Sequence, residues 1–230
     1  MRLIFIHGAG CTSAAFEAQL AAFDGALAVT LPGHAGEGGG PSTIDEFADL
    51  LEPAIDARSG DDAIVCGHSM GGAIALTLGL RDLPRIRGII VIGSGAKLRV
   101  APALFEALER DFPAGAHALA GSYFADPTPA RVAAATALML AVGQAQTIRD
   151  FRACDAFDAR ERLARLRVPL LALTGDRDVL TPPKFAQFLA DRVPAGSARI
   201  LTGAGHFAMI ERPDETNERI RAFVASTPTR

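Results

Sequence analysis

Hydrophobic positions along this chain of 230 residues fall into short apolar runs that alternate with longer amphipathic stretches. The runs are rich in β-branched residues and end near glycine-containing turns. Runs of this length are typical of strands that helices cover on both faces, as in a parallel sheet. We therefore expect about six strands, at residues 3–6, 27–31, 63–66, 88–93, 168–174 and 198–202.

The stretches between these runs have helical periodicity. When strands and helices alternate along a chain, the expected fold class is α/β, with a mainly parallel sheet between layers of helices. The expected helices lie at residues 13–23, 43–58, 70–82, 182–192 and 213–226.

One segment, residues 97–160, breaks this alternation. It contains no strand-like run, and its alanine-rich amphipathic segments are interrupted by prolines and a glycine. The pattern predicts three or four short helices inserted between two strands, which is typical of a lid or cap. We assign residues 1–96 and 161–230 to the core and residues 97–160 to the cap. The interruptions lie at Pro102, Pro113, Pro127, Pro129 and Gly143.

The composition is that of a globular protein of one domain with a small insertion. Hydrophobic residues make up 49% of the chain and charged residues 21%. The formal net charge of −3 argues against a dedicated nucleic-acid-binding protein, which would carry a basic excess. Neither a phosphate-binding loop nor a dinucleotide fingerprint fits the chain, and no metal-ligand spacing is present, so we expect neither cofactor nor metal.

The cysteines and the N-terminal apolar run indicate in which cellular compartment the protein is expected. Cys11, Cys66 and Cys154 are odd in number and widely spaced, which favours reduced thiols, as in a cytosol. The first apolar run is too short for the core of a signal peptide, and no window approaches the roughly 18 apolar residues of a membrane span. We therefore expect a cytoplasmic protein without a membrane partner.

The most specific motif is Gly67-His68-Ser69-Met70-Gly71, a G-x-S-x-G between an expected strand and an expected helix. A serine on such a tight turn presents its hydroxyl above the sheet, and the flanking glycines let neighbouring backbone pass. The helix that follows stabilises negative charge at its N-terminus. A serine that only caps this helix is the alternative, but the strand–turn–helix context favours a nucleophile.

With this motif in place, the chain resembles the α/β-hydrolase family along nearly its whole length. The first strand-like run leads directly into the HG motif, so we expect the family's usual N-terminal antiparallel pair of strands to be missing. The resemblance rests on HGAG (7–10), LPGH (31–34), GHSMGG (67–72), GDRD (175–178) and GAGH (203–206).

The family's order along the chain is serine, acid, then histidine, and this order selects among five histidines. His206 follows the acid candidates in a glycine-rich loop, so we assign it as the base. The resemblance gives His7 a structural role in the HGAG segment (7–10), which we call the oxyanion loop. We expect His34 to line the pocket or stabilise its turn, His68 to point away from the base, and His117 to be exposed.

Two aspartates compete for the role of the acid. The family motif G-x-x-D places the acid three residues after the glycine, which selects Asp178. Asp176 is then expected to accept turn hydrogen bonds from nearby amides. The resemblance also implies an oxyanion hole built from the backbone N–H groups of Met70 and Ala9, with Gly10 as the weaker alternative to Ala9.

These assignments predict a serine hydrolase that cleaves small, largely apolar carboxylic esters through an acyl-enzyme. A lactonase, a carbon–carbon bond hydrolase or a lyase of the menaquinone-pathway type would use the same triad. A small-molecule receptor with a slow triad is the alternative of another class, and multiple turnovers above about 1 s⁻¹ would favour an enzyme over it. A small-molecule ester is the expected partner, while monomer and homodimer both stay open. Candidate substrate-binding residues are Phe105, Phe112, Tyr123, Phe124, Met139 and Phe151.

Overall fold

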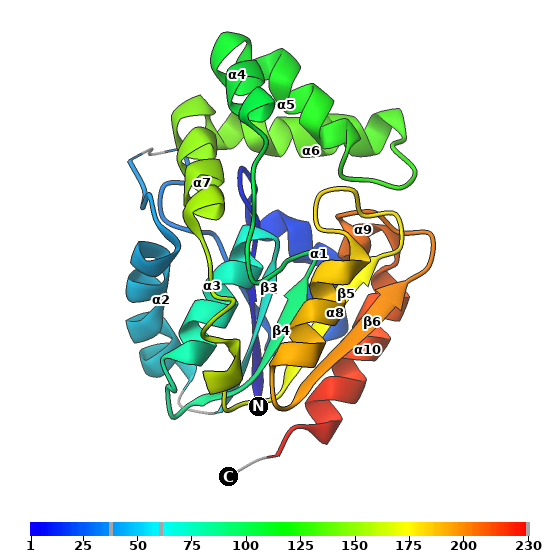
Figure 1. Ribbon diagram of the computed structural model, residues 1–230. Helices are drawn as coiled ribbons and strands as arrows, with labels where there is room; N and C mark the ends of the chain where they lie inside the picture. Colours follow the sequence, from blue (N-terminus) through cyan, green and yellow to red (C-terminus); the bar gives the residue numbers. More distant parts are fainter. Residues whose placement is uncertain (37–38, 60–61, 229–230) are drawn as a thin grey trace.

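A single parallel sheet of six strands forms the centre of the protein (Figure 1). The computed structural model describes residues 1–36, 39–59 and 62–228. All neighbouring strands pair in parallel, in the order β2-β1-β3-β4-β5-β6, which confirms the predicted fold class. The strands are β1 (Arg2–Ile6), β2 (Leu27–Val29), β3 (Ala63–His68), β4 (Ile86–Ile92), β5 (Leu170–Gly175) and β6 (Gly196–Leu201).

The central strands are apolar on both faces because a hydrophobic cluster lies on each side of the sheet. In β1, Ile4 and Ile6 belong to one cluster, while Leu3 and Phe5 belong to the other. The same alternation continues through the central strands, as expected when successive side chains point to opposite faces. Burial on both faces explains why these strands read as continuous apolar runs.

Helices cover both faces of the sheet, with α2, α3 and α8 on one side and α1 and α10 on the other (Figure 1). Each expected helix is present, although residues 13–16 of the first one form a 3-10 turn. The short helix α9 had no counterpart in the sequence pattern. The bounds are α1 (Glu17–Ala22), α2 (Ile44–Ser59), α3 (Met70–Leu80), α8 (Pro183–Arg192), α9 (Ala208–Glu211) and α10 (Pro213–Ser226).

Four helices lie between β4 and β5 and form what we call the helical insertion, above the carboxyl ends of the strands (Figure 1). Prolines stand in the first turns of three of them, where their fixed φ is tolerated and no N–H is needed. Gly143, with φ of 90°, separates the last two. The helices are α4 (Pro102–Arg110), α5 (Phe112–Gly121), α6 (Pro129–Val142) and α7 (Gln144–Ala156).

The three cysteines are buried and form no disulfide. Burial raises the pKa of the Cys11 thiol to about 12, so this thiol is protonated at neutral pH. In the described ranges, no helix combines the length and apolar character needed to cross a bilayer. Over the same residues, no group of three or more His, Cys, Asp and Glu side chains is arranged to hold a metal ion.

Candidate active site

Ser69 lies on the turn between β3 and α3 in a backbone conformation that side chains rarely adopt. Its φ of 52° and ψ of −115° lie outside the helical and strand regions. Such a conformation costs about 1–3 kcal/mol and persists only where its surroundings enforce it. Here the N–H of Ser69 donates to the carbonyl of Ile92 at 2.9 Å, and a Cβ at Gly67 or Gly71 would collide with neighbouring backbone. The local sequence therefore enforces this sharp turn between β3 and α3, which we call the elbow.

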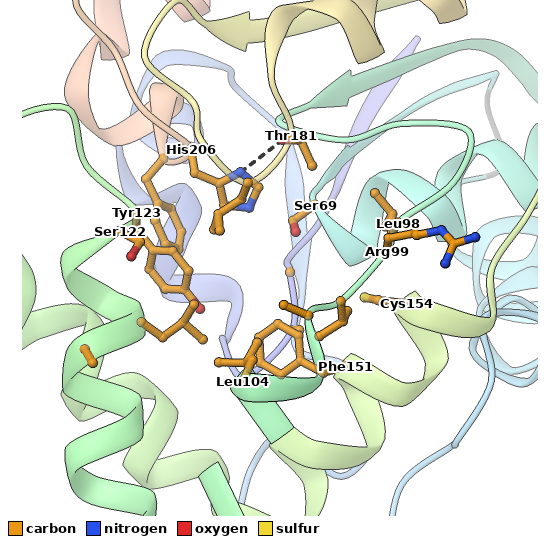
Figure 2. A pocket seen from close by; sticks show the side chains of 18 of the residues that line it. Ser69, Leu98, Arg99, Leu104, Ser122, Tyr123, Phe151, Cys154, Thr181 and His206 are labelled. Carbon is orange, nitrogen blue, oxygen red and sulfur yellow. Dashed lines mark hydrogen bonds between the residues drawn. The ribbon is translucent and has the colours of Figure 1, made fainter. Parts of the chain in front are cut away.

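The elbow presents Ser69 to a cavity of about 410 Å³ between the sheet and the helical insertion. Ser69 and His206 both line this cavity, and Figure 2 shows their side chains side by side at its edge. The two residues come from loops after β3 and β6, at the carboxyl ends of the strands. Ligands of open parallel sheets bind at this edge.

The ring of His206 is oriented by Asp178. Nδ1 of His206 lies 3.0 Å from Oδ2 of Asp178, and both side chains are almost completely buried. Because the carboxylate can only accept, Nδ1 carries the proton, which leaves Nε2 as the nitrogen that can take one up. Across the part of the chain that the structure describes, no side chain or backbone group occupies this Nε2.

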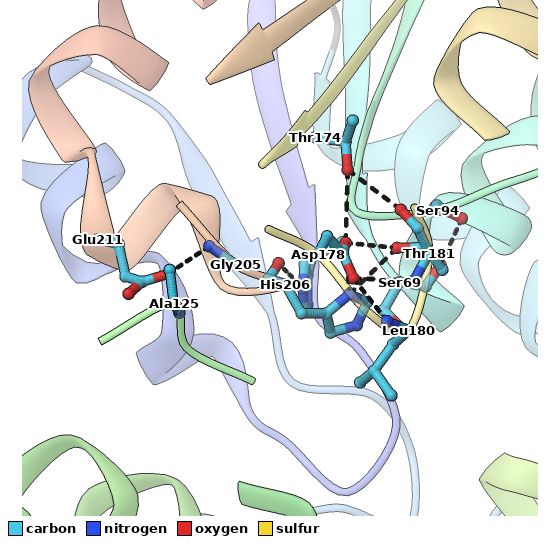
Figure 3. A network of polar contacts seen from close by, with 11 residues as sticks. Ser69, Ser94, Ala125, Thr174, Asp178, Leu180, Thr181, Gly205, His206 and Glu211 are labelled. Atoms are coloured by element: carbon cyan, nitrogen blue, oxygen red, sulfur yellow. Dashed lines mark hydrogen bonds and ion pairs between the residues drawn. The ribbon is translucent and has the colours of Figure 1, made fainter. Parts of the chain in front are cut away.

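The turn after β5 surrounds Asp178 with donors (Figure 3). Its Oδ1 accepts the N–H groups of Leu180 and Thr181 at 2.9 and 2.8 Å, and its Oδ2 accepts the Thr181 hydroxyl at 2.6 Å. Burial alone would raise the pKa of Asp178, but the interaction with His206 and these hydrogen bonds outweigh it and lower the pKa to about 2. Asp178 is therefore ionised at neutral pH.

Asp176 occupies a different environment from Asp178. Its side chain is exposed, and its Oδ1 accepts the N–H of Gly203 at 2.7 Å, in the loop that carries His206. Asp176 thus accepts a backbone amide, as predicted, but this amide belongs to the neighbouring loop, while the amides of Leu180 and Thr181 are bound by Asp178.

The two residues predicted to supply oxyanion amides, Ala9 and Met70, both lie near Ser69. Ala9 lines the cavity beside Ser69, while Met70 begins α3, where the first amides of a helix have no partner within the helix. Among the described residues, no acceptor is bound to the N–H of Ala9 or of Met70.

A comparison with known proteins agrees with this geometry. The model of the alpha/beta hydrolase family matches residues 3–219. The chain belongs to the alpha/beta hydrolase family. It is 30% identical to a protein of Azorhizobium caulinodans named as a carbamate hydrolase, over 96% of this chain and 90% of that protein. It is 27% identical to 3-oxoadipate enol-lactonase 1 of Acinetobacter baylyi, over 97% and 88% of the two chains.

Solved structures give the same result. A thermophilic esterase superimposes with a TM-score of 0.88 at 28% sequence identity, covering 97% of this chain and 89% of that one. The protein is therefore a hydrolase of this family, with esterases and lactonases among its relatives.

His7 and His34 do not line the cavity beside Ser69. His7 is buried: its Nδ1 donates to the carbonyl of Gly8 at 2.9 Å, and its Nε2 accepts the N–H of Leu31 at 3.0 Å. Burial and the nearby His34 lower the pKa of His7 to about 3, so it stays neutral. His34 does not line the cavity, and it pairs with Asp150 of α7 at 2.8 Å.

His117 is exposed, as predicted, whereas the expectation for His68 was wrong. The His68 ring turns toward His206, with centroids 4.8 Å apart, and its Nε2 donates to the carbonyl of His206 at 3.1 Å. It also stacks on Phe207. The strand that precedes Ser69 lies beside the histidine loop, so a side chain at this position supports that loop. Burial and then the neighbouring His206 lower the pKa of His68 well below its usual range.

Two of the six predicted substrate-binding residues, Tyr123 and Phe151, line the cavity (Figure 2). The other four do not, which corrects the prediction. Their side chains pack in the hydrophobic cluster that joins the insertion to the sheet, because most apolar residues of a small insertion are needed for its own core. These four are Phe105, Phe112, Phe124 and Met139. Lining residues that the sequence did not suggest include Leu98, Val100, Leu104, Leu119, Leu180 and Phe185.

Two polar residues near the site also escaped sequence analysis. The hydroxyl of Thr181 lies 2.6 Å from Asp178 and 3.1 Å from Nδ1 of His206, so it contacts both members of the pair. Glu211 of α9 accepts the N–H of Gly205 at 2.6 Å and thereby holds the loop of His206 (Figure 3). Thr181 lies three residues after the acid, a spacing that hints at a turn, but nothing in the sequence around Glu211 indicates its role.

Proposed function

We propose that this hydrolase cleaves small, largely apolar carboxylic esters through an acyl-enzyme on Ser69. The observation that carries the proposal is the arrangement of Ser69 and His206 at one cavity, with Nδ1 of His206 bound to Asp178 and Nε2 left open. This is the arrangement that a histidine base needs if it is to take a proton from a serine hydroxyl.

In the proposed reaction, Nε2 of His206 takes the Ser69 proton while Oγ forms a bond to the ester carbonyl carbon. The negative charge that develops on the carbonyl oxygen is bound by the N–H groups of Ala9 and Met70. His206 then gives its proton to the leaving alcohol as the ester C–O bond breaks. Water repeats the sequence on the acyl-enzyme, releasing the carboxylic acid and free Ser69.

The character of the cavity supports an uncharged substrate. Most of its lining residues are apolar, and its volume of about 410 Å³ suits a small ligand. Among the described residues that line the cavity, Arg99 is the one Lys or Arg, and Figure 2 shows its guanidinium extending away from Ser69. A carboxylate or phosphate close to the scissile bond would therefore lack a counter-charge.

The test is hydrolysis of p-nitrophenyl butyrate by the wild type, Ser69→Ala and Ser122→Ala. Ser122 also lines the cavity, so its replacement removes a second hydroxyl by the same change of side chain. We expect Ser69→Ala to lower kcat by about 10⁴-fold or more, since the nucleophile is lost. Ser122→Ala should stay within about threefold, because a residue outside the acyl-transfer steps contributes only to binding. Equal rates for the wild type and Ser69→Ala would contradict the proposal.

A lactone is the second candidate substrate, favoured by the similarity to an enol-lactonase over 97% of this chain. The chemical steps are the same, but the alcohol stays attached to the acyl group. Measuring kcat/KM for a matched series of linear esters and lactones, ranked by acyl length, separates the two substrate classes.

A further inference from the structure

A second buried carboxylate, Asp150 of α7, binds the loop that follows β1. Its Oδ2 accepts the N–H of Gly10 at 2.9 Å and faces Nε2 of His34 at 2.8 Å. Its Oδ1 accepts the side-chain amide of Gln146 at 2.8 Å. The Asp150 and His34 side chains are fully buried, so this carboxylate is satisfied entirely by protein groups. It lies outside the cavity lined by Ser69.

The partners of His34 indicate that it is charged. Its Nδ1 lies 3.2 Å from the carbonyl of Pro32, and its Nε2 faces the Asp150 carboxylate, so both nitrogens meet groups that can only accept. Burial lowers the pKa of His34, but the Asp150 carboxylate outweighs it and raises that pKa overall. The nearest other histidine, His7, is neutral because its Nε2 accepts a backbone N–H. Asp150 thus binds both His34 and the N–H of Gly10.

Gly10 adopts a left-handed backbone conformation where its N–H binds Asp150. Its φ of 58° is left-handed, and a Cβ there would press on Met139 and Thr147. The N–H of Gly10 points to Asp150, and Gly10 is not among the residues that line the cavity. The preceding residue, Ala9, does line the cavity, and no acceptor in the described part of the chain takes its N–H.

We propose that Asp150 is a positioning residue of the oxyanion hole. By binding the N–H of Gly10, it fixes the turn that would present the N–H of Ala9 to the oxyanion, and it removes Gly10 as a competing donor. The helical insertion would therefore position one of the two donor amides, which belongs to the core. This inference rests on the proposed acyl-transfer function.

The test compares two ligands that differ in one feature, an oxyanion. An aryl or alkyl trifluoromethyl ketone accepts Oγ of Ser69 at its carbonyl carbon, the proton moves to His206, and the carbonyl oxygen becomes a bound oxyanion. The matching trifluoromethyl carbinol occupies the same cavity without forming this bond. Both affinities are measured by inhibition of ester hydrolysis, in the wild type, Asp150→Ala and Asp155→Ala.

For Asp150→Ala we expect ketone affinity to fall about 10- to 100-fold, somewhat less than the loss that follows removal of an oxyanion donor. Its carbinol affinity should stay within about twofold, since only the oxyanion requires the hole. Asp155 is the matched control: it lies on the same helix and accepts a backbone N–H, that of Val100 at 3.0 Å, but not one of the oxyanion loop. Because Val100 lines the cavity, any change in Asp155→Ala should be the same for both ligands, so the ratio of ketone to carbinol affinity should stay as in the wild type.

A second measurement needs no substitution and covers the case in which Asp150→Ala does not fold. In ¹⁵N-labelled wild type, formation of the hemiketal should move the amide proton resonances of Ala9 and Met70 downfield and leave that of Gly10 nearly unchanged. A downfield shift of Gly10 in place of Ala9 would overturn the proposal.

The remaining outcomes are equally decisive. Equal loss of ketone and carbinol affinity in Asp150→Ala would show a general collapse of the cavity and overturn the positioning role. Unchanged ketone affinity in that variant would do the same while leaving the proposed function intact. A wild type that hydrolyses no ester and forms no hemiketal would overturn the proposed function and this inference with it.

Discussion

His206 and His34 are both buried beside an aspartate, at 3.0 and 2.8 Å, yet their second ring nitrogens differ. Nε2 of His206 faces the cavity of Ser69, whereas Nδ1 of His34 lies against the carbonyl of Pro32. A histidine with both nitrogens bound to acceptors has no site for a further proton. Pairing with a carboxylate therefore does not make a base by itself, and an open nitrogen at a cavity is also required.

Asp178 and Asp150, the partners of these two histidines, differ in where their other hydrogen bonds come from. Asp178 takes its backbone donors from Leu180 and Thr181 in its own turn, so a short segment builds its site. Asp150 binds groups from the oxyanion loop, from His34 and from its own helix, which lie far apart in the sequence. The donors to Asp178 thus come from one short segment, whereas the contacts of Asp150 join the insertion to the core.

The largest test of this contrast replaces each histidine in turn. We expect His206→Ala to lower kcat for p-nitrophenyl butyrate by about 10⁴-fold or more, because the base is lost. His34→Ala should lower kcat by only about tenfold, through the loosened Asp150 contact to the oxyanion loop. The two kcat values are measured by steady-state kinetics on variants that still unfold cooperatively. Similar losses of kcat in His206→Ala and His34→Ala would contradict the contrast between the two histidines.

A second test replaces the two carboxylates of the GDRD turn by amides, one at a time. Asp178→Asn should lower kcat by about 10⁴-fold with little change in KM, since the amide no longer holds the reactive tautomer of His206. Asp176→Asn, which changes an exposed side chain by the same single group, should stay within about threefold. A larger loss in Asp176→Asn would reassign the acid.

The smallest effect concerns the charge of His34, measured by NMR titration of its ring. Its pKa should lie above 6.5 in the wild type and below 6.5 in Asp150→Asn, where burial remains but the carboxylate is gone. If the titration is unchanged by Asp150→Asn, the carboxylate is not what charges His34.

The same shifts determine how stability depends on pH. His34 has a raised pKa, so its contribution is fully present below pH 6.5 and is lost as the pH rises through the folded value. His7 has the opposite sign: its pKa of about 3 makes the folded state lose stability as the pH falls from 6.5 toward 3. Urea unfolding at several pH values should show a smaller acid-side loss in His7→Asn than in the wild type.

Sequence patterns predicted the parts of the molecule that local rules govern. Apolar runs located the strands, and the strand–turn–helix context singled out Ser69. Chain order within the family then proposed His206 and Asp178, and the structure brings these side chains together at one cavity. The strands and the turn at Ser69 follow from residues within one element or one turn, whereas His206 and Asp178 follow from the order of the family's motifs along the chain.

The parts that sequence analysis missed depend on contacts between distant segments. The proposed role of Asp150 depends on its hydrogen bond with the N–H of Gly10, 140 positions away along the chain, and no local sequence pattern indicates that contact. The cavity wall likewise depends on how the insertion helices pack, so four of the six proposed lining residues proved to be core. His68 was misjudged because its orientation is set by the neighbouring histidine loop.

Glu211 adds a second connection between the insertion and the core. It accepts the N–H of Gly205 in the histidine loop and also those of Ala125 and Asp126, between α5 and α6. Together with the Asp150 contact, this connects the insertion through carboxylates and amides to the loop after β1 and to the loop of His206. Insertions are thus not interchangeable modules in this architecture. A segment transplanted from a relative to change substrate preference would need its own acceptor for Gly10 and two backbone amides for Glu211.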